Sequence, residues 1–513
     1  MPTDVVERME MWAHLIQTVF VFAFGACAGS LINVLAYRMP LGISVVMPPS
    51  RCPSCKTRLT WRENIPILGW ILLRGRCRFC KCKISPEYPL VEALVAVLFA
   101  GIYVLWYAVP RHGNWPVVQH AWFLGFDWSI IKPEWAYGGF ASAWPIFVMV
   151  LVLVGSLVAM TLTDIKTYMI PLQLAWTPAV VGILAHTGWG VYLSVVGNVS
   201  YATAWMKTAP GWTWVIASPG KAGWSIVGAA IGGIVGLGIA NVLLSKGLIR
   251  RSFADYDEWE KAHKQTEAVP QATPEAQGVG VEVGEPQSPG ATAMIAEGSP
   301  VPPVDPAQAT PLAPPESQAA EGRNHSEAGE NPTEMWLEYP HARREMLKEL
   351  IFLAPCLALA MLGASLAHTW AGPWIAGPTP LSPGTPTTPV PLWLDATTAS
   401  IFGFLVGGGV VWLIRILGSL AFGKEALGLG DVHMMAGVGA CLGWIDATFG
   451  FFLSAFVGLA WAGGAAIVKG KGARALPLGP SLAAATMLVL VGKVGIERLM
   501  NIIASAWAPW NLP

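Results

Sequence analysis

Two aspartates stand in the chain where a membrane makes a carboxylate costly. Asp164 follows the apolar run from Ile146 to Thr163, and Asp431 ends the sequence Gly428-Leu429-Gly430-Asp431 between two long apolar segments. A carboxylate at the edge of hydrocarbon is unfavourable unless it is paired, protonated or hydrated, so an acid in such a place predicts a functional site. Two such acids predict a dyad.

The chemistry open to such a dyad is peptide hydrolysis. Two carboxylates held close together do not both ionise, so one serves as a base and its partner as an acid near neutral pH. The ionised member takes a proton from water while the protonated member donates to the scissile carbonyl oxygen. The sequence does not assign these roles between Asp164 and Asp431. Gly428 and Gly430 would let a substrate backbone approach, or let the loop take a positive φ. The competing interpretation is a plain turn between helices.

A second group of reactive side chains consists of cysteines. Cys52-Pro-Ser-Cys55 and Cys77-Arg-Phe-Cys80 form two C-x-x-C pairs within a basic segment. Paired thiolates at this spacing suit tetrahedral Zn²⁺, so they predict a structural metal site. Reduced surface thiols and a redox-active dithiol are the alternatives. Cys82 could replace Cys80 as a ligand or remain free.

The elements that must position these residues are transmembrane helices. The chain has 513 residues, of which 54% are hydrophobic and only 12% are charged, so it is predicted to be an all-α, polytopic membrane bundle of about eight or nine spans. Apolar stretches begin near Ala13, Pro89, Pro145, Leu172, Trp224, Leu350, Ala399, Trp444 and Ser481.

Five segments follow from this pattern. Residues 1–37 are the first transmembrane helix, 38–88 a cytoplasmic zinc-binding loop, 89–250 helices that include Asp164, 251–345 an insertion, and 346–513 helices that include Asp431. Lysine and arginine collect in 38–88, which places that loop on the cytoplasmic side, and counting spans places both aspartates there too. The insertion is rich in Pro, Ala and Glu, which predicts disorder with short amphipathic ends.

Taken together, these motifs resemble those of type IV prepilin peptidases. Gly25 to Pro40 is similar to the family's first-helix signature, and the four cysteines with the segment Ile84 to Glu92 to its zinc loop. Asp164 with Ile170-Pro171 resembles the first catalytic motif, and Gly428 to Asp431 the GxGD motif.

The resemblance implies an aspartic endopeptidase of the bacterial inner membrane, with Asp164 and Asp431 as catalytic residues and structural zinc on Cys52, Cys55, Cys77 and Cys80. It implies cleavage of leader peptides from type IV prepilins or type II secretion pseudopilins on the cytoplasmic side. It also implies methylation of the new N-terminus from S-adenosylmethionine. The expected partners are pilin-like precursors and membrane lipid, and no nucleic acid.

The chain departs from the family at two places. His433 stands where the family usually has a lysine, and Pro477-Leu478-Gly479-Pro480 lacks the usual phenylalanines. Glu92 and Ser30 could pack helices together or line a substrate or methyl-donor site. Two other classes of function stay open: an ion-coupled transporter that uses the paired acids, and a catalytically silent scaffold of a secretion machine.

Overall fold

The computed structural model describes residues 3–47, 49–52, 54–108, 133, 136, 139–167, 169–195, 221–253, 342–370, 392–423, 425–469 and 478–507. The chain divides into two compact units, one formed by Met1–Ser252 with Pro340–Pro513 and the other by Phe253–Tyr339. Residues 254–341, which make up most of the predicted insertion, lie outside the described residues.

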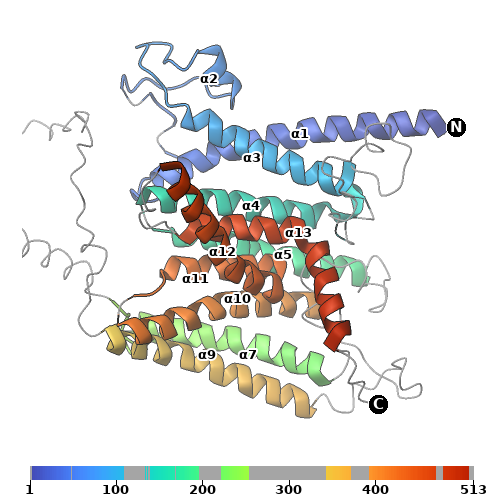
Figure 1. The fold of residues 1–513 in the computed structure, drawn as a ribbon, viewed down its shortest axis with the longest axis vertical. Helices are drawn as coiled ribbons and strands as arrows, with labels where there is room; N and C mark the ends of the chain where they lie inside the picture. Colours follow the sequence, from blue (N-terminus) through green and yellow to red (C-terminus); the bar gives the residue numbers. More distant parts are fainter. Residues whose placement is uncertain are drawn as a thin grey trace, which may run out of the picture. The chain divides into compact units, whose positions relative to one another are not determined.

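The first unit is a helical bundle, and its described part contains no strand (Figure 1). Its elements are α1 (Thr3–Arg38), α2 (Leu68–Leu72), α3 (Glu87–Tyr103), the π-helical turn η1 (Val104–Ala108), α4 (Phe140–Thr167), α5 (Leu172–Val195), α7 (Lys221–Ser245), α9 (Ala342–Trp370), α10 (Leu392–Phe422), α11 (Leu429–Leu442), α12 (Trp444–Lys469) and α13 (Leu478–Trp507).

Among the described residues, eight of these helices are long and apolar enough to cross a membrane. The predicted all-α, polytopic architecture is therefore confirmed, with α1, α3, α4, α5, α7, α9, α10 and α12 as the candidate spans. The ninth predicted span begins near Ser481 and corresponds to α13, whose described apolar part, Leu478–Lys493, is shorter.

Helix α11 is a short apolar helix that the hydropathy pattern did not separate from its neighbours. Its 14 residues rise about 21 Å. It is joined to α12 by the single residue Gly443, which has φ +91° and therefore takes a conformation that suits glycine. Asp431 and Gly443 therefore lie at opposite ends of α11.

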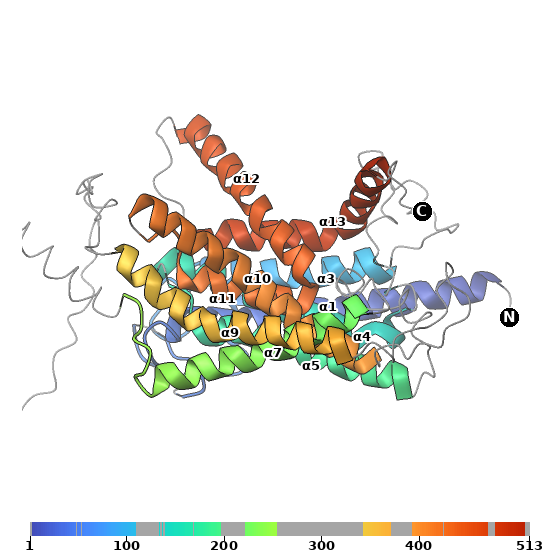
Figure 2. The ribbon, with the colours of Figure 1, turned by 90° about the horizontal axis from the view of Figure 1, so that it is seen from below.

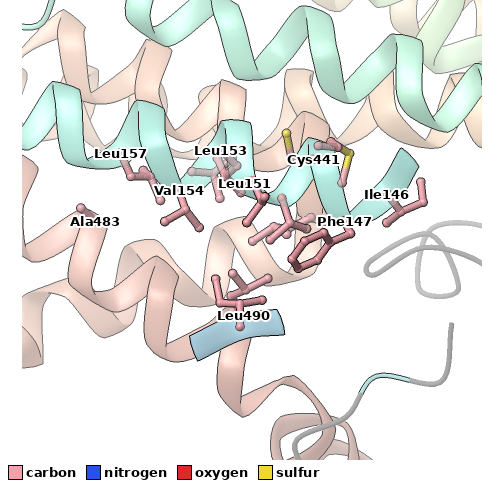
Figure 3. Close-up of a cluster of buried hydrophobic side chains, with 14 of the residues drawn as sticks. Ile146, Phe147, Leu151, Leu153, Val154, Leu157, Cys441, Ala483 and Leu490 are labelled. Carbon is pink, nitrogen blue, oxygen red and sulfur yellow. The ribbon is translucent and has the colours of Figure 1, made fainter. Parts of the chain in front are cut away.

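The core is built around α4. Its buried positions Leu153, Leu157 and Met160 recur at helical spacing, and the same face ends in Asp164. Figure 3 shows apolar side chains of α4 gathered with Cys441 of α11 and Ala483 and Leu490 of α13. The packing of one helix face therefore carries Asp164 toward the elements that hold Asp431.

Glycines allow several helix pairs to approach at backbone distance. Figures 1 and 2 show α7 and α9 side by side, and the contact uses glycines spaced four residues apart on α7. A Cβ added at Gly228, Gly232 or Gly236 would lie 2.1 Å, 1.9 Å or 2.3 Å from a carbonyl oxygen of α9. Small residues at such spacing are what membrane helices use to pack closely, because lipid supplies no hydrophobic drive for association.

The same device joins α10 to α11. A Cβ at Gly403 would lie 2.1 Å from the Gly439 carbonyl oxygen, and one at Gly439 would lie 2.0 Å from the Gly403 carbonyl oxygen. In α1, Gly25 and Gly29 admit the backbone of α3, with an added Cβ 2.8 Å from Ala96 Cα and 2.6 Å from Glu92 Cα respectively. The glycines of the first-helix signature therefore serve helix packing.

Replacing Gly232 by alanine should destabilise the bundle, because the new methyl group would overlap Leu359 O and force α7 away from α9. Overpacking of this kind costs about 1–3 kcal/mol. Thermal unfolding in detergent should show a transition several degrees lower. Gly238→Ala on the same helix is the matched control, since its Cβ would meet nothing within 4 Å. Equal transition temperatures in the two variants would contradict the close contact.

Candidate active site

Asp164 lies in the last turn of α4 with its side chain buried. Its Oδ2 accepts a hydrogen bond of 3.1 Å from the backbone N–H of Gly479, in the first turn of α13. Backbone N–H groups in a first helical turn have no partner within the helix and favour negative charge. The start of α13 therefore holds the Asp164 carboxylate in place.

Only glycine fits at position 479 in this arrangement. A Cβ there would lie 2.5 Å from Oδ2 of Asp164 and 3.1 Å from its carboxyl carbon. The carboxylate can therefore reach the Gly479 N–H only because residue 479 has no side chain. The sequence analysis gave Gly479 no role in the site. Its segment, Pro477 to Pro480, stood out only because it lacks the phenylalanines usual in the family.

Asp431 lies in the first turn of α11, also buried. Gly428 is the N-cap residue, and its carbonyl oxygen accepts the Asp431 N–H at 3.3 Å. A carboxylate in the first turn of a helix is stabilised by the partial positive charge there. Both acids of the predicted dyad therefore lie at helix N-termini, Asp431 on its own helix and Asp164 on α13.

The two glycines before Asp431 do not serve a positive φ. Gly428 has φ −68° and ψ 144°, and Gly430 lies inside α11. A Cβ at Gly430 would lie 2.9 Å from Cβ of Ile170. Gly430 therefore lets the start of α11 lie directly against Ile170, so the two predicted motifs touch. The positive-φ interpretation of these glycines is wrong, because the constraint is close packing.

Asp164 and Asp431 lie on helices that contact each other, α4 and α11, and Ile170, which follows α4, packs against Gly430 beside Asp431. Each side chain is only 8% exposed, so little water screens their repulsion. Lys166, two residues after Asp164, pairs with Glu87 at the start of α3. The dyad therefore lies at the end of the bundle that carries the cysteine loop.

The cysteine loop contains two copies of one backbone turn. In the first, Lys56 N–H donates to Cys52 O and Cys52 N–H donates to Thr57 O; in the second, Lys81 N–H donates to Cys77 O and Cys77 N–H to Cys82 O. Lys56 and Lys81, each directly after the second cysteine, have φ +56° and +60°. The repeated turn aims the two thiols of each pair to one side.

The four predicted ligands converge. The Sγ atoms of Cys52, Cys55, Cys77 and Cys80 all lie within 4.8 Å of one another, with Cys52 and Cys80 at 3.8 Å and Cys55 and Cys77 at 4.0 Å. Tetrahedral zinc with Zn–S bonds of about 2.3 Å needs sulfurs roughly 3.8 Å apart. The four thiols therefore fit a zinc ion, which would tie the two turns together.

Cys82 lies beside this cluster, with its Sγ 3.5 Å from Sγ of Cys52. In the repeated turn it occupies the place that Thr57 has in the first copy, which is not a ligand place. A hydrogen bond from the Cys55 backbone lowers the pKa of the Cys52 thiol to about 6, which favours the thiolate that metals bind.

Glu92 connects the cysteine loop to the bundle. Its Oε2 accepts a hydrogen bond of 2.7 Å from the N–H of Ile67, and Ser30 of α1 also bonds to its carboxylate. Ile67 has φ +62° and ψ −57°, a strained conformation for a β-branched residue that costs on the order of 1–3 kcal/mol. Of the two interpretations left open for Glu92 and Ser30, these contacts favour packing.

His433 turns back onto its own helix. Its Nδ1 donates to the Leu429 carbonyl oxygen at 2.7 Å, and the ring is only partly exposed. The unsatisfied backbone groups at a helix N-terminus are N–H groups, so this bond to a carbonyl oxygen orients the ring and does not cap α11.

A known protein family matches the part of the chain that contains the cysteine loop. Residues 23–106 match the bacterial peptidase A24 N-terminal domain. This stretch contains the first-helix signature, the four cysteines and Glu92. The resemblance to prepilin peptidases is thereby confirmed for this part of the chain.

Individual proteins similar to this chain carry the name of the same family. A prepilin leader peptidase/N-methyltransferase of Myxococcus xanthus is 54% identical over 81 residues, 16% of this chain and 24% of the relative. One from Klebsiella pneumoniae is 43% identical over 103 residues, 18% of this chain and 45% of the relative. One from Pectobacterium carotovorum is 26% identical over 208 residues, 36% of this chain and 62% of the relative.

The chain thus spans about a quarter to three fifths of the length of these relatives. No solved structure matches it.

Gly479→Ala should abolish the arrangement of the dyad without unfolding the bundle. The methyl group would occupy the space of Asp164 Oδ2, so the carboxylate must rotate away and lose the Gly479 N–H. We expect any peptidase activity that depends on the Asp164 carboxylate to fall about 100-fold, as a displacement of about 1 Å does. Gly492→Ala on the same helix is the control, since its Cβ would meet nothing within 4 Å. Full activity in Gly479→Ala would contradict this geometry.

Metal content tests the cysteine cluster. Purified protein should carry one zinc per chain by mass spectrometry of the metal, and Cys52→Ser or Cys77→Ser should lose it. Cys82→Ser should keep it, which makes Cys82 a control within the same loop. Loss of zinc in Cys82→Ser with retention in Cys80→Ser would show that the ligand set is wrong.

Proposed function

We propose that this protein is a membrane aspartic endopeptidase that removes leader peptides from type IV prepilins or type II secretion pseudopilins. The single observation that carries the proposal is that two buried carboxylates, Asp164 and Asp431, lie at the N-termini of α13 and α11, and that these two helices contact each other and α4. The relatives' names supply the substrate class.

In the proposed reaction the dyad holds one proton between two carboxylates. The ionised member accepts a proton from water, and the resulting nucleophile attacks the scissile carbonyl carbon. The protonated member donates to the carbonyl oxygen, and the proton gained by the first then moves to the leaving amine. Two carboxylates this little exposed would not both ionise if held close together, so the proposed pair would hold a single proton.

The helix termini would fix the geometry of this step. The Gly479 N–H holds Oδ2 of Asp164, so one carboxylate is oriented before substrate arrives. Gly430 in contact with Ile170 keeps α11 against the segment that follows α4. Such preorganisation lowers the barrier because groups need not reorient during the reaction.

Zinc would be structural in this scheme. Cys52, Cys55, Cys77 and Cys80 would hold it, and the ion would fasten the two turns of the loop. Its place in a loop joined to α3 and α1 through Glu92 suits a surface that receives the substrate's leader. The side of the membrane on which this loop lies is proposed to be the cytoplasmic side of a bacterial inner membrane, since the loop is the most basic part of the chain.

Methyl transfer from S-adenosylmethionine to the new N-terminus is the second half of the proposal. It rests on the relatives' names. Of the polar pair considered for a donor site, Glu92 bonds to Ser30 and to the N–H of Ile67, and these contacts favour packing. No described contact favours the transporter or the scaffold.

Co-expression with a pilin precursor should establish the activity. The wild-type protein should remove the leader, and Asp164→Asn and Asp431→Asn should each lower cleavage at least 1,000-fold, since the dyad acts as a unit. Mass spectrometry of the mature N-terminus reads both the cut and any added methyl group. A variant at Asp446, an acid on α12 paired with Lys493, is the control and should cleave normally. An intact precursor beside correctly inserted wild-type protein would reject the proposal.

A further inference from the structure

A second buried set of charges lies beside the loop that leads into Asp431. Arg415 of α10 and Glu349 of α9 are 2% and 3% exposed. Nη2 of Arg415 donates to Oε1 of Glu349 at 3.0 Å, and Nε donates to the same carboxylate at 3.2 Å and 3.3 Å. This paired geometry uses the planar fork that distinguishes arginine from lysine.

The other end of the Arg415 guanidinium binds the loop between α10 and α11, at residues 425–427. Nη1 donates both to the carboxylate of Glu425 and to the carbonyl oxygen of Leu427, the residue before Gly428. One side chain therefore binds the loop through a charge and through its backbone. Because Leu427 O is a backbone atom, the contact fixes the path of the chain into α11.

Helix α10 supplies two further contacts to the same loop. The buried hydroxyl of Ser419 accepts the N–H of Ala426 at 3.0 Å, and Gly418 admits Ala426, whose Cβ would lie 2.7 Å from an added Cβ. The last turns of α10 thus form a cradle for residues 425–427.

Glu349 holds Arg415 from the other side. Besides the arginine, its carboxylate accepts Trp412 Nε1 at 2.8 Å and Ser252 Oγ at 3.0 Å. Glu349 therefore has hydrogen bonds on both oxygens, which is what a buried carboxylate requires. These hydrogen bonds hold Glu349, and through it the Arg415 guanidinium, independently of the contacts with the loop.

We infer that Arg415 is a positioning residue for the reaction: anchored by Glu349, it holds the chain at Leu427 and so places Asp431 opposite Asp164. This inference rests on the proposed function for the reaction that the placement serves. Arg415 does not reach the substrate in this scheme. It acts through the loop, as a fixed point between α9, α10 and the start of α11.

Cleavage kinetics in detergent with a purified pilin precursor test the role. Arg415→Gln should lower kcat about 100-fold, as a displacement of about 1 Å does, with KM nearly unchanged, since substrate contacts remain. Arg415→Lys keeps the charge but loses the fork, so it should restore part of the rate. Asp446→Asn, which breaks the buried pair of Asp446 with Lys493 at the far end of α11, should leave kcat unchanged. If Arg415 served only the stability of the bundle, Arg415→Gln and Asp446→Asn would both lower the yield of folded protein, and the folded fraction of each would cleave at the wild-type kcat.

Hydrogen exchange provides a readout that needs no activity. The amides of residues 425–431 should exchange at least ten times faster in Arg415→Gln and at the wild-type rate in Asp446→Asn. If wild-type protein fails to cleave, the proposed function fails, and the exchange rates still decide whether Arg415 holds the loop. If wild-type protein cleaves and Arg415→Gln matches it in kcat and in exchange, the inference about Arg415 is wrong while the proposed function stands.

Discussion

The structure depends on holding two carboxylates close together where little water reaches them. Asp164 and Asp431 are each 8% exposed, and carboxylates with so little water around them are costly to hold near each other. The protein offsets this with helix N-termini: Gly479 N–H at the start of α13 binds Asp164, and Asp431 lies in the first turn of α11. Three helices must therefore end or begin at one point, and the packing of the bundle serves to bring them there.

Close approach at that point is possible because glycine replaces a side chain where two surfaces meet. Gly479 leaves room for the Asp164 carboxylate, and Gly430 leaves room for Ile170. The same solution recurs away from the site, in α7 against α9 and in α10 against α11. In a membrane, where apolar side chains gain little by leaving lipid for a protein surface, this contact of backbones is a main source of helix association. The dyad is thus built with the same device as the bundle around it.

The cysteine loop is attached at its own end of the bundle by a different means. Two copies of a turn, each followed by a lysine at positive φ, converge their thiols, and Glu92 binds the strained Ile67 to α3. Lys166 and Glu87 link α3 to the helix of Asp164. The cysteine loop and the two aspartates are therefore connected through hydrogen bonds and an ion pair at one end of the bundle.

The sequence by itself determined what depends on local pattern. Long apolar runs required transmembrane helices, the C-x-x-C pairs required a shared thiol cluster, and Asp164 and Asp431 stood out because acids are costly beside hydrocarbon. Only the tertiary structure decided which distant groups complete the site. Gly479 is 315 residues from Asp164, and Glu349 is 66 residues from Arg415, so no spacing along the chain relates them. It also showed α11 as a helix of its own, which the predicted spans omit, and assigned Gly430 to packing against Ile170. Hydropathy records how apolar a segment is, whereas these contacts depend on which faces of the helices meet.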